Sequence, residues 1–159
     1  MREILFRGKR IDNGEWVEGH FIEQHTPVYH AYIVPYIMIE QDNRHTDILE
    51  HWIEEVDPDT VGQYTGLKDK AGKKIFDGDL LNGFRYPFLS DNAHNYFAEV
   101  VWFDNSPAFG LVTHKNPLSA VRGISAGNAD YMEDFDPSNW EVIGNIHDDP
   151  ELLGGDADA

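Results

Sequence analysis

Three evenly spaced histidines are the first residues in this sequence that could do chemistry, by binding a metal ion. His20, His25 and His30 are separated by five positions each, and Pro27 interrupts the segment. Side chains that share a face lie two positions apart on a strand, or three or four apart on a helix. A step of five places neighbouring histidines on opposite faces of a strand. We therefore predict no metal site here, and no cofactor.

Paired carboxylates are the second candidate, because two of them can act as general acid and general base. Glu54-Glu55, Asp77 with Asp79, and Glu133-Asp134 are such pairs, but a chain with 29 acidic residues contains them by chance. The sequence has no cysteine, no serine in a nucleophile elbow, and no glycine-rich phosphate loop followed by Lys and Ser or Thr. We predict no catalytic residues and a protein that is not an enzyme.

The charge of the chain restricts its partners. Twelve Lys and Arg residues against 29 Asp and Glu residues give a net charge of −17, which repels phosphate backbones. Direct nucleic-acid binding is therefore disfavoured. The acidity either keeps the protein soluble or forms a surface that competes for a basic, nucleic-acid-binding host protein. In the second case, acids mixed with aromatic residues would dock on the partner, and the candidates are Tyr131, Glu133, Asp134 and Phe135.

A lysine cluster stands between two acidic segments of the chain. Lys68, Lys70, Lys73 and Lys74 either face solvent or meet an acidic face of a second subunit, so a homo-oligomer is one alternative. No apolar run approaches the roughly 20 residues of a membrane span, and the first residues do not resemble a signal peptide. We expect a protein of the bacterial cytoplasm with no membrane contact.

Turn signals indicate how the chain folds around these residues. Gly72 and Gly78 follow short apolar runs and are expected to adopt the positive φ of tight turns. Asp79, directly after Gly78, is expected to accept hydrogen bonds from neighbouring backbone N–H groups. Asn13-Gly14 is the strongest hairpin signal and fits a two-residue type I′ turn.

Short apolar runs between these turns indicate strands and a mainly β fold. Residues 28–40 favour an edge strand, or two strands broken at Pro35, and residues 47–56 fit a strand or a helix, of which we favour the strand. We predict an N-terminal β-meander (residues 1–60) packed on a C-terminal, SH3-like small β barrel with inserted loops (61–153), followed by a disordered tail (154–159). The other predicted strands cover residues 2–10, 16–22, 96–103, 109–113 and 140–146.

Three blocks of the sequence resemble the YopX family. The central block is Gln63–Lys70 followed by Asp77-Gly78-Asp79. The first ten residues with Asp12–Val17 resemble the opening of the family, and Val142–Ile146 with Pro150–Leu153 resemble its end. The blocks stand in the family's order and frame nearly the whole chain.

This resemblance implies a protein encoded by a phage or prophage, mostly of β structure, without an established activity. It supplies no catalytic or binding residues. We therefore expect an accessory protein that binds an unknown host or phage protein. The alternative is a nucleic-acid-binding or processing protein of phage replication.

Overall fold

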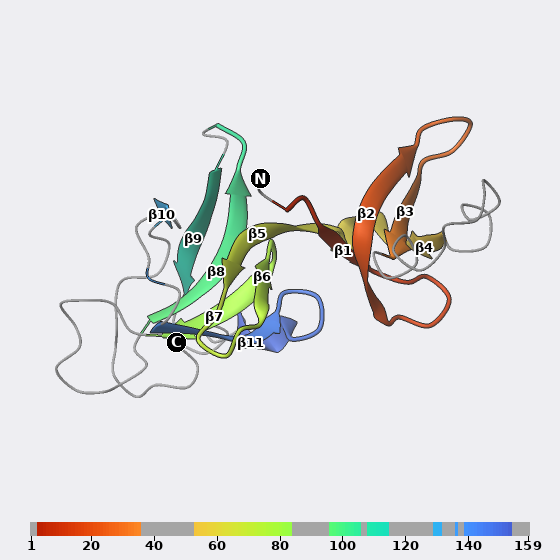
Figure 1. Ribbon diagram of the computed structural model, residues 1–159. Coiled ribbons are helices and arrows are strands. Elements are labelled where there is room, and N and C mark those ends of the chain that lie inside the picture. The colour runs from red at the N-terminus through yellow and green to blue at the C-terminus, as the bar shows by residue number, and fades with distance from the viewer. Residues whose placement is uncertain are drawn as a thin grey trace, which may run out of the picture. The chain divides into compact units, whose positions relative to one another are not determined.

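The protein is mainly β, and its strands form two antiparallel sheets (Figure 1). The computed structural model describes residues 3–35, 53–83, 96–105, 108–114, 129–131, 136 and 139–153. The chain divides into two compact units, Met1–Tyr64 and Thr65–Ala159. The sequence analysis placed this boundary after residue 60. In the described part of the chain, no helix is long and apolar enough to cross a membrane.

The first sheet has six strands in the order β4-β3-β2-β1-β5-β6. A 3₁₀ turn, η1, covers Pro58–Thr60 and connects β4 to β5. Strand β5 belongs to both units, because it begins before the division at Tyr64 and ends after it. The strands are β1 (Phe6–Lys9), β2 (Trp16–Gln24), β3 (His30–Pro35), β4 (Glu54–Val56), β5 (Gly62–Lys68) and β6 (Lys74–Phe76).

The core of the first unit lies against β3, which has a neighbour on each side. Ala31 and Ile33 alternate along β3 and are buried with Val56 of β4. The Phe6 and Phe21 rings pack against this cluster with their centroids 5.2 Å apart. Burial of an alternate set of side chains fixes the register, since a slip of one residue would expose all of them.

The second sheet has five strands in the order β10-β9-β8-β7-β11. All of its neighbouring strands run antiparallel. Its strands are β7 (Asp79–Gly83), β8 (Tyr96–Phe103), β9 (Ala108–His114), β10 (Ala129–Tyr131) and β11 (Trp140–Asn145), and a 3₁₀ turn, η5, follows at Pro150–Leu152. Its core cluster is Ile75, Leu81, Ala98, Val100, Phe109, Leu111, Trp140 and Val142.

The predicted mainly β fold is confirmed, but the SH3-like barrel is not. Within the described residues, neither sheet closes on itself. The strand preferred for residues 47–56 is present at Glu54–Val56 as β4, whereas residues 47–52 lie outside the description. The tail at residues 154–159 lies outside it as well.

The edge strand that was one alternative for residues 28–40 is wrong, and so is the turn type at Asn13-Gly14. Strand β3 is an inner strand, because its backbone pairs with both β2 and β4. It ends at Pro35, where the other alternative placed a break, and residues 36–40 lie outside the described residues. The turn at Asn13-Gly14 is wider than type I′. The Gly14 N–H donates to the carbonyl of Arg10 and the Arg10 N–H to that of Glu15, both at 2.9 Å, so residues 11–14 all lie within the loop.

Candidate functional site

The residues predicted to build turns do so in the second unit. Gly72 and Gly78 have φ of +83° and +82°, in the left-handed region that favours glycine. The Asp79 carboxylate accepts a hydrogen bond from the Phe76 N–H at 2.8 Å. These positive φ angles and this hydrogen bond shape the backbone of the turns.

Asp69 has a larger structural role, which the sequence analysis missed. One carboxylate oxygen accepts from the N–H groups of Ala71 and Lys73, each at 2.9 Å, and the other accepts from Val142 of β11 at 3.1 Å. Burial by itself would raise the pKa of Asp69. The three backbone donors and the charge of Lys73 outweigh it and hold the pKa below its usual value. The sequence signal for this role is an Asp at the start of a Gly-containing turn, where its side chain can accept hydrogen bonds from nearby backbone N–H groups.

The residues proposed for protein binding are only partly described. Tyr131 is the last residue of β10, where its backbone lies opposite Gly110 of β9. Glu133, Asp134 and Phe135 lie outside the described residues. The structure therefore does not test this group as a site.

The three evenly spaced histidines, for which we predicted no metal site, lie in three places. His20 is on β2, His25 is in the loop that follows, and His30 is on β3. His25 Nε2 is 3.5 Å from the Glu23 carboxylate, and His30 Nδ1 is 2.6 Å from the Glu55 carboxylate. Within the described ranges, no group of three His, Cys, Asp or Glu residues could hold a metal ion.

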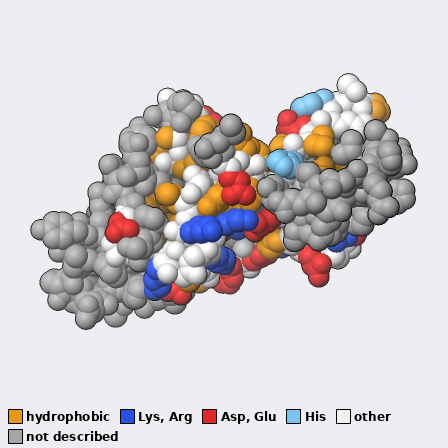
Figure 2. Space-filling view, viewed as in Figure 1, with side chains coloured by type: hydrophobic (Ala, Val, Ile, Leu, Met, Phe, Trp, Pro, Cys, Tyr) orange, Lys and Arg blue, Asp and Glu red, His pale blue; other side chains and the backbone are white. Residues whose placement is uncertain are grey.

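The lysine cluster lies on the hairpin formed by β5 and β6, and one of its members has an acidic partner within the chain. Lys70 Nζ is 2.6 Å from the Glu141 carboxylate of β11. Figure 2 shows Lys and Arg side chains beside Asp and Glu side chains on the face of the molecule that it draws. Interspersed charges of both signs are typical of a solvated surface.

A different site is formed by the loop between β1 and β2, which is fastened to β4 by backbone hydrogen bonds. The Ile11 N–H donates to the Glu55 carbonyl at 3.1 Å, and the Asp57 N–H donates to the Lys9 carbonyl at 2.8 Å. Arg10 also forms an isolated antiparallel bridge with Val56. The backbone at the start of this loop is therefore held against β4.

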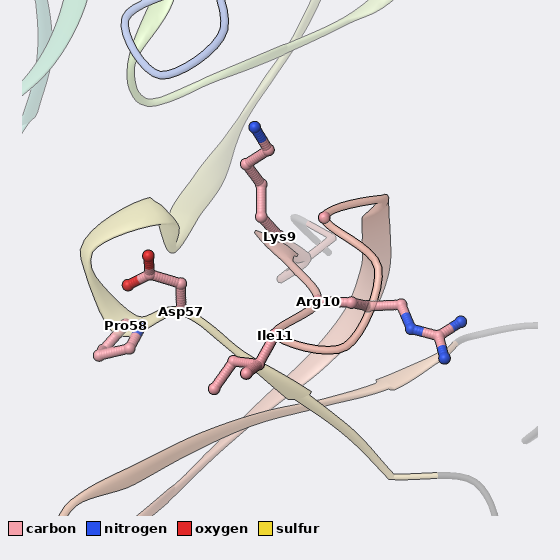
Figure 3. Close-up of a pocket in the computed structure, with 6 residues that line it drawn as sticks. Lys9, Arg10, Ile11, Asp57 and Pro58 are labelled. Carbon is pink, nitrogen blue, oxygen red and sulfur yellow. The ribbon is translucent and has the colours of Figure 1, made fainter.

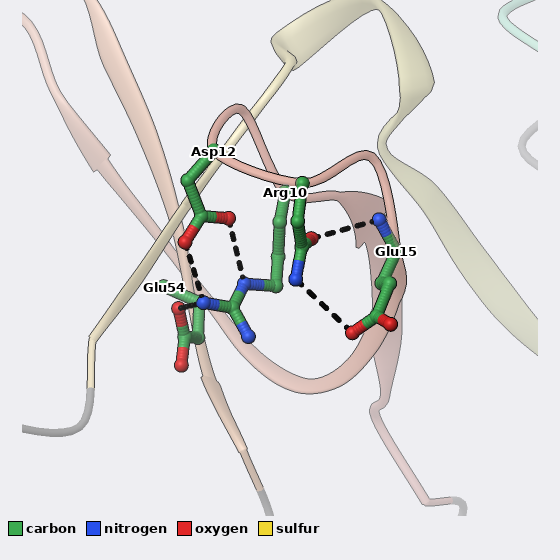
Figure 4. A network of polar contacts seen from close by, with 5 residues as sticks. Arg10, Asp12, Glu15 and Glu54 are labelled. Atoms are coloured by element: carbon green, nitrogen blue, oxygen red, sulfur yellow. Dashed lines mark hydrogen bonds and ion pairs between the residues drawn. The ribbon is translucent and has the colours of Figure 1, made fainter.

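Arg10 connects the loop to β4 through its side chain (Figure 4). Its Nε and one terminal nitrogen donate to the two oxygens of Asp12 at 3.0 and 2.7 Å, and the same terminal nitrogen is 3.1 Å from the Glu54 carboxylate. The hydrogen bond to Asp12 is the main cause that raises the pKa of Arg10 above its usual value. The guanidinium thus contacts two carboxylates and connects Asp12 of the loop to Glu54 of β4.

An open concavity of about 450 Å³ lies beside this loop (Figure 3). Figure 3 shows the Lys9 and Arg10 side chains extending in different directions from the loop. Ile11 is 61% exposed although it is a large apolar residue. The concavity is lined by Lys9, Arg10, Ile11, Gly14, Asp57 and Pro58.

Trp16, at the start of β2, lies next to two cations, of which Lys9 lines the concavity. The guanidinium carbon of Arg7 lies 4.7 Å from the centroid of the Trp16 ring, and Lys9 Nζ lies 5.8 Å from it. These distances are within the range of cation–π attraction. The site therefore combines an exposed aliphatic side chain, a basic side chain over an aromatic ring, and a fixed backbone.

The sequence contains a signal for the exposure of Ile11, though not for the concavity. Ile11 is an apolar residue inside the polar run from Arg10 to Glu15. Such a residue in a turn has no core to enter, so its exposure follows from its position.

Comparisons with known proteins place the chain in a family. No curated protein matches it. Among solved structures, the crystal structure of protein EF1440 from Enterococcus faecalis is similar, with 21% identity and a TM-score of 0.44. The similarity covers 96% of this chain and 99% of that one. The family model described as YopX protein matches residues 5–154, nearly the whole chain. The chain therefore belongs to the YopX family.

Proposed function

We propose that this protein is a phage- or prophage-encoded accessory protein that acts by binding another protein, without catalysis, and that the loop between β1 and β2 is its contact point. The observation that carries the proposal is the exposure of Ile11, 61%, in a loop whose backbone is hydrogen-bonded to β4. The resemblance to phage-encoded YopX proteins supports the proposed origin in a phage or prophage.

A fixed loop favours binding because little conformational entropy is lost when it is buried. The hydrogen bonds of Ile11 and Asp57 to neighbouring strands order this backbone before a partner arrives. Complete burial of an isoleucine side chain contributes about 1.5–3 kcal/mol. The partner needs an apolar hollow for Ile11, with a carboxylate near Lys9.

The test compares two substitutions of equally exposed side chains. Val28 is also 61% exposed and lies between β2 and β3, away from the concavity. Tagged wild type, Ile11→Asp and Val28→Asp are used to capture proteins from lysates of the host. We expect one reproducible partner with wild type and Val28→Asp, and its loss with Ile11→Asp. Equal capture by all three proteins would contradict this placement of the site.

A second copy of the chain is one partner that the same variants can identify. Sedimentation of purified protein over a range of concentrations measures self-association directly. A dimer that Ile11→Asp disrupts and Val28→Asp preserves would make the partner a second subunit. A wild-type monomer at all concentrations directs the search to other proteins.

The alternative function, nucleic-acid binding, is favoured by the placement of Lys9 next to Trp16. Aromatic rings that stack on bases and cations that contact phosphates are the elements of single-strand binding. The charge of −17 opposes it. An electrophoretic shift of single-stranded DNA at low salt that disappears as salt increases, and that Trp16→Ala abolishes, would establish this alternative in place of protein binding.

A further inference from the structure

Two Asn-Gly dipeptides occur in the chain, and the structure places them in opposite environments. Asn13-Gly14 lies in the exposed loop between β1 and β2, and Asn82-Gly83 lies at the end of the buried strand β7. Asparagine followed by glycine is prone to spontaneous deamidation, because glycine has no Cβ to obstruct its backbone nitrogen. We propose that Asn13 is a deamidation site of the folded protein, that Asn82 is not, and that the contacts of the loop set the rate at Asn13.

The reaction needs only water and the chain itself. The backbone nitrogen of Gly14 loses its proton to solvent base and attacks Cγ of Asn13. The new N–Cγ bond closes a succinimide ring, the bond from Cγ to Nδ2 breaks, and the amide leaves as ammonia after taking a proton. Water then opens the ring at either carbonyl, which gives aspartate or isoaspartate at position 13.

Three hydrogen bonds in the loop restrain the reacting groups. The Gly14 N–H donates to the Arg10 carbonyl at 2.9 Å, so the attacking nitrogen is engaged. The Asn13 side chain accepts from the Glu15 N–H at 2.9 Å through Oδ1 and donates to the Glu15 carboxylate at 3.1 Å through Nδ2 (Figure 4). Both side-chain bonds are solvent-exposed and Gly14 is an exposed residue, and exposed bonds open by local fluctuation without global unfolding. The loop therefore slows the reaction but does not prevent it.

Asn82 is restrained much more strongly. It is 8% exposed, and its backbone lies opposite Phe97 of β8 and Glu141 of β11. A Cβ added at Gly83 would be 2.7 Å from the Asn139 carbonyl oxygen and 2.8 Å from the Trp140 ring, so this backbone is closely surrounded. Rotation of this backbone into a succinimide requires separation of β7 from both neighbours, which amounts to unfolding of the sheet.

The product changes the electrostatics of the loop. A carboxylate at position 13 stands between Asp12 and Glu15 and competes with Asp12 and Glu54 for the Arg10 guanidinium. Isoaspartate also adds a methylene to the backbone and so displaces Gly14. Modification thus alters the loop that carries Ile11, whether or not that loop binds a partner.

The experiment measures conversion of both asparagines in the same tube. Full-length protein is incubated at mildly alkaline pH, either native or in concentrated urea, and peptides containing Asn13 and Asn82 are quantified by mass spectrometry. We expect both peptides to convert at similar rates in urea, and only the Asn13 peptide to convert in the native protein. Equal native rates at the two sites, or a native Asn13 that stays intact while the urea sample converts, would overturn the proposal.

Two variants of Glu15 test the role of the loop contacts. Glu15→Ala removes the acceptor for Nδ2, whereas Glu15→Gln retains a side-chain oxygen at that place. We expect a severalfold faster conversion of native Asn13 in Glu15→Ala and a rate close to wild type in Glu15→Gln, with Asn82 intact in both. Unchanged conversion in Glu15→Ala, or faster conversion of Asn82 as well, would show that the loop contacts do not set the rate.

Discussion

At the scale of single residues, the Asp69 carboxylate takes the place of a neighbouring strand at the outer edge of β11. The last strand of a sheet has unpaired backbone groups along one side. Here the Val142 N–H donates to Asp69 Oδ2 and the Trp140 carbonyl accepts from the Lys70 N–H. The turn after β5 therefore satisfies part of this edge.

We expect Asp69→Asn to destabilise the protein by about 1–3 kcal/mol, because a buried hydrogen-bonding group loses its partner. The carboxylate accepts through both oxygens, whereas the NH₂ group of asparagine faces an N–H donor in either orientation. Denaturant unfolding measures the change. Asp104→Asn, an exposed position after β8, is the matched control, and an equal effect of the two substitutions would contradict the role of Asp69.

The same residue predicts part of the acid sensitivity. Its folded-state pKa lies below the usual value of about 3.9, so its contribution is complete above the unfolded-state pKa and is lost as pH falls through the folded-state pKa. We expect a plot of unfolding free energy against pH to be shallower for Asp69→Asn than for wild type below about pH 4. Parallel curves would show that protonation of Asp69 does not contribute.

Gly78 provides a second test at this scale. Its φ of +82° is costly for a β-branched side chain, although an added Cβ would be 3.4 Å from the nearest atom, on Ile146. The strain alone should therefore make Gly78→Val less stable by about 1–3 kcal/mol, measured as a lower melting temperature. An unchanged melting temperature would mean that the turn adjusts without cost.

At the scale of elements, the pairing of β2 with β3 depends on one close approach. Gly19 lies opposite Pro35, and a Cβ at Gly19 would overlap the backbone carbonyl of Val34. Because a carbonyl within a strand cannot turn aside as a side chain can, the strands would have to separate.

We expect Gly19→Ala to lower the free energy of unfolding by at least about 1–3 kcal/mol, the usual cost of overpacking. It should also reduce the hydrogen-exchange protection of β2 and β3. Gly8→Ala is the informative comparison, since its Cβ would meet the Val56 side chain at 3.0 Å. A side chain can shift more readily than backbone. A smaller effect at Gly19 than at Gly8 would contradict this reasoning.

Elements that carry their own local signal were predictable from the sequence. Strand β8 and the turns at Gly72 and Gly78 follow from apolar runs and glycine positions. The inner position of β3 did not follow, because Pro35 indicates an edge and only the long-range pairing with β4 shows otherwise. The concavity beside Ile11 was not predictable either, since it joins residues from the two ends of the first unit.

At the scale of the whole molecule, two cores with separate residues are linked through one continuous strand. The first unit packs around Ala31, Ile33 and Val56, and the second around a cluster that includes Leu81 and Trp140. Strand β5 pairs with β1 at Gly62 and Gln63 and continues past Tyr64 into the second unit. Without this strand β1 of the first unit loses a partner, whereas the five-stranded sheet of the second unit does not include β5.

The shared strand makes aggregation the expected result of cutting the chain in the wrong place. A fragment of residues 1–60 lacks β5, so the β1 groups that pair with Gly62 and Gln63, and the Leu5 carbonyl that accepts from the Tyr64 N–H, face solvent. An unpaired edge of this kind is a template for pairing with another chain. In light scattering at equal concentrations, we expect residues 1–60 to self-associate more than residues 1–76, which retain β5 and its neighbour β6. Equal scattering by the two fragments would show that β5 does not protect this edge.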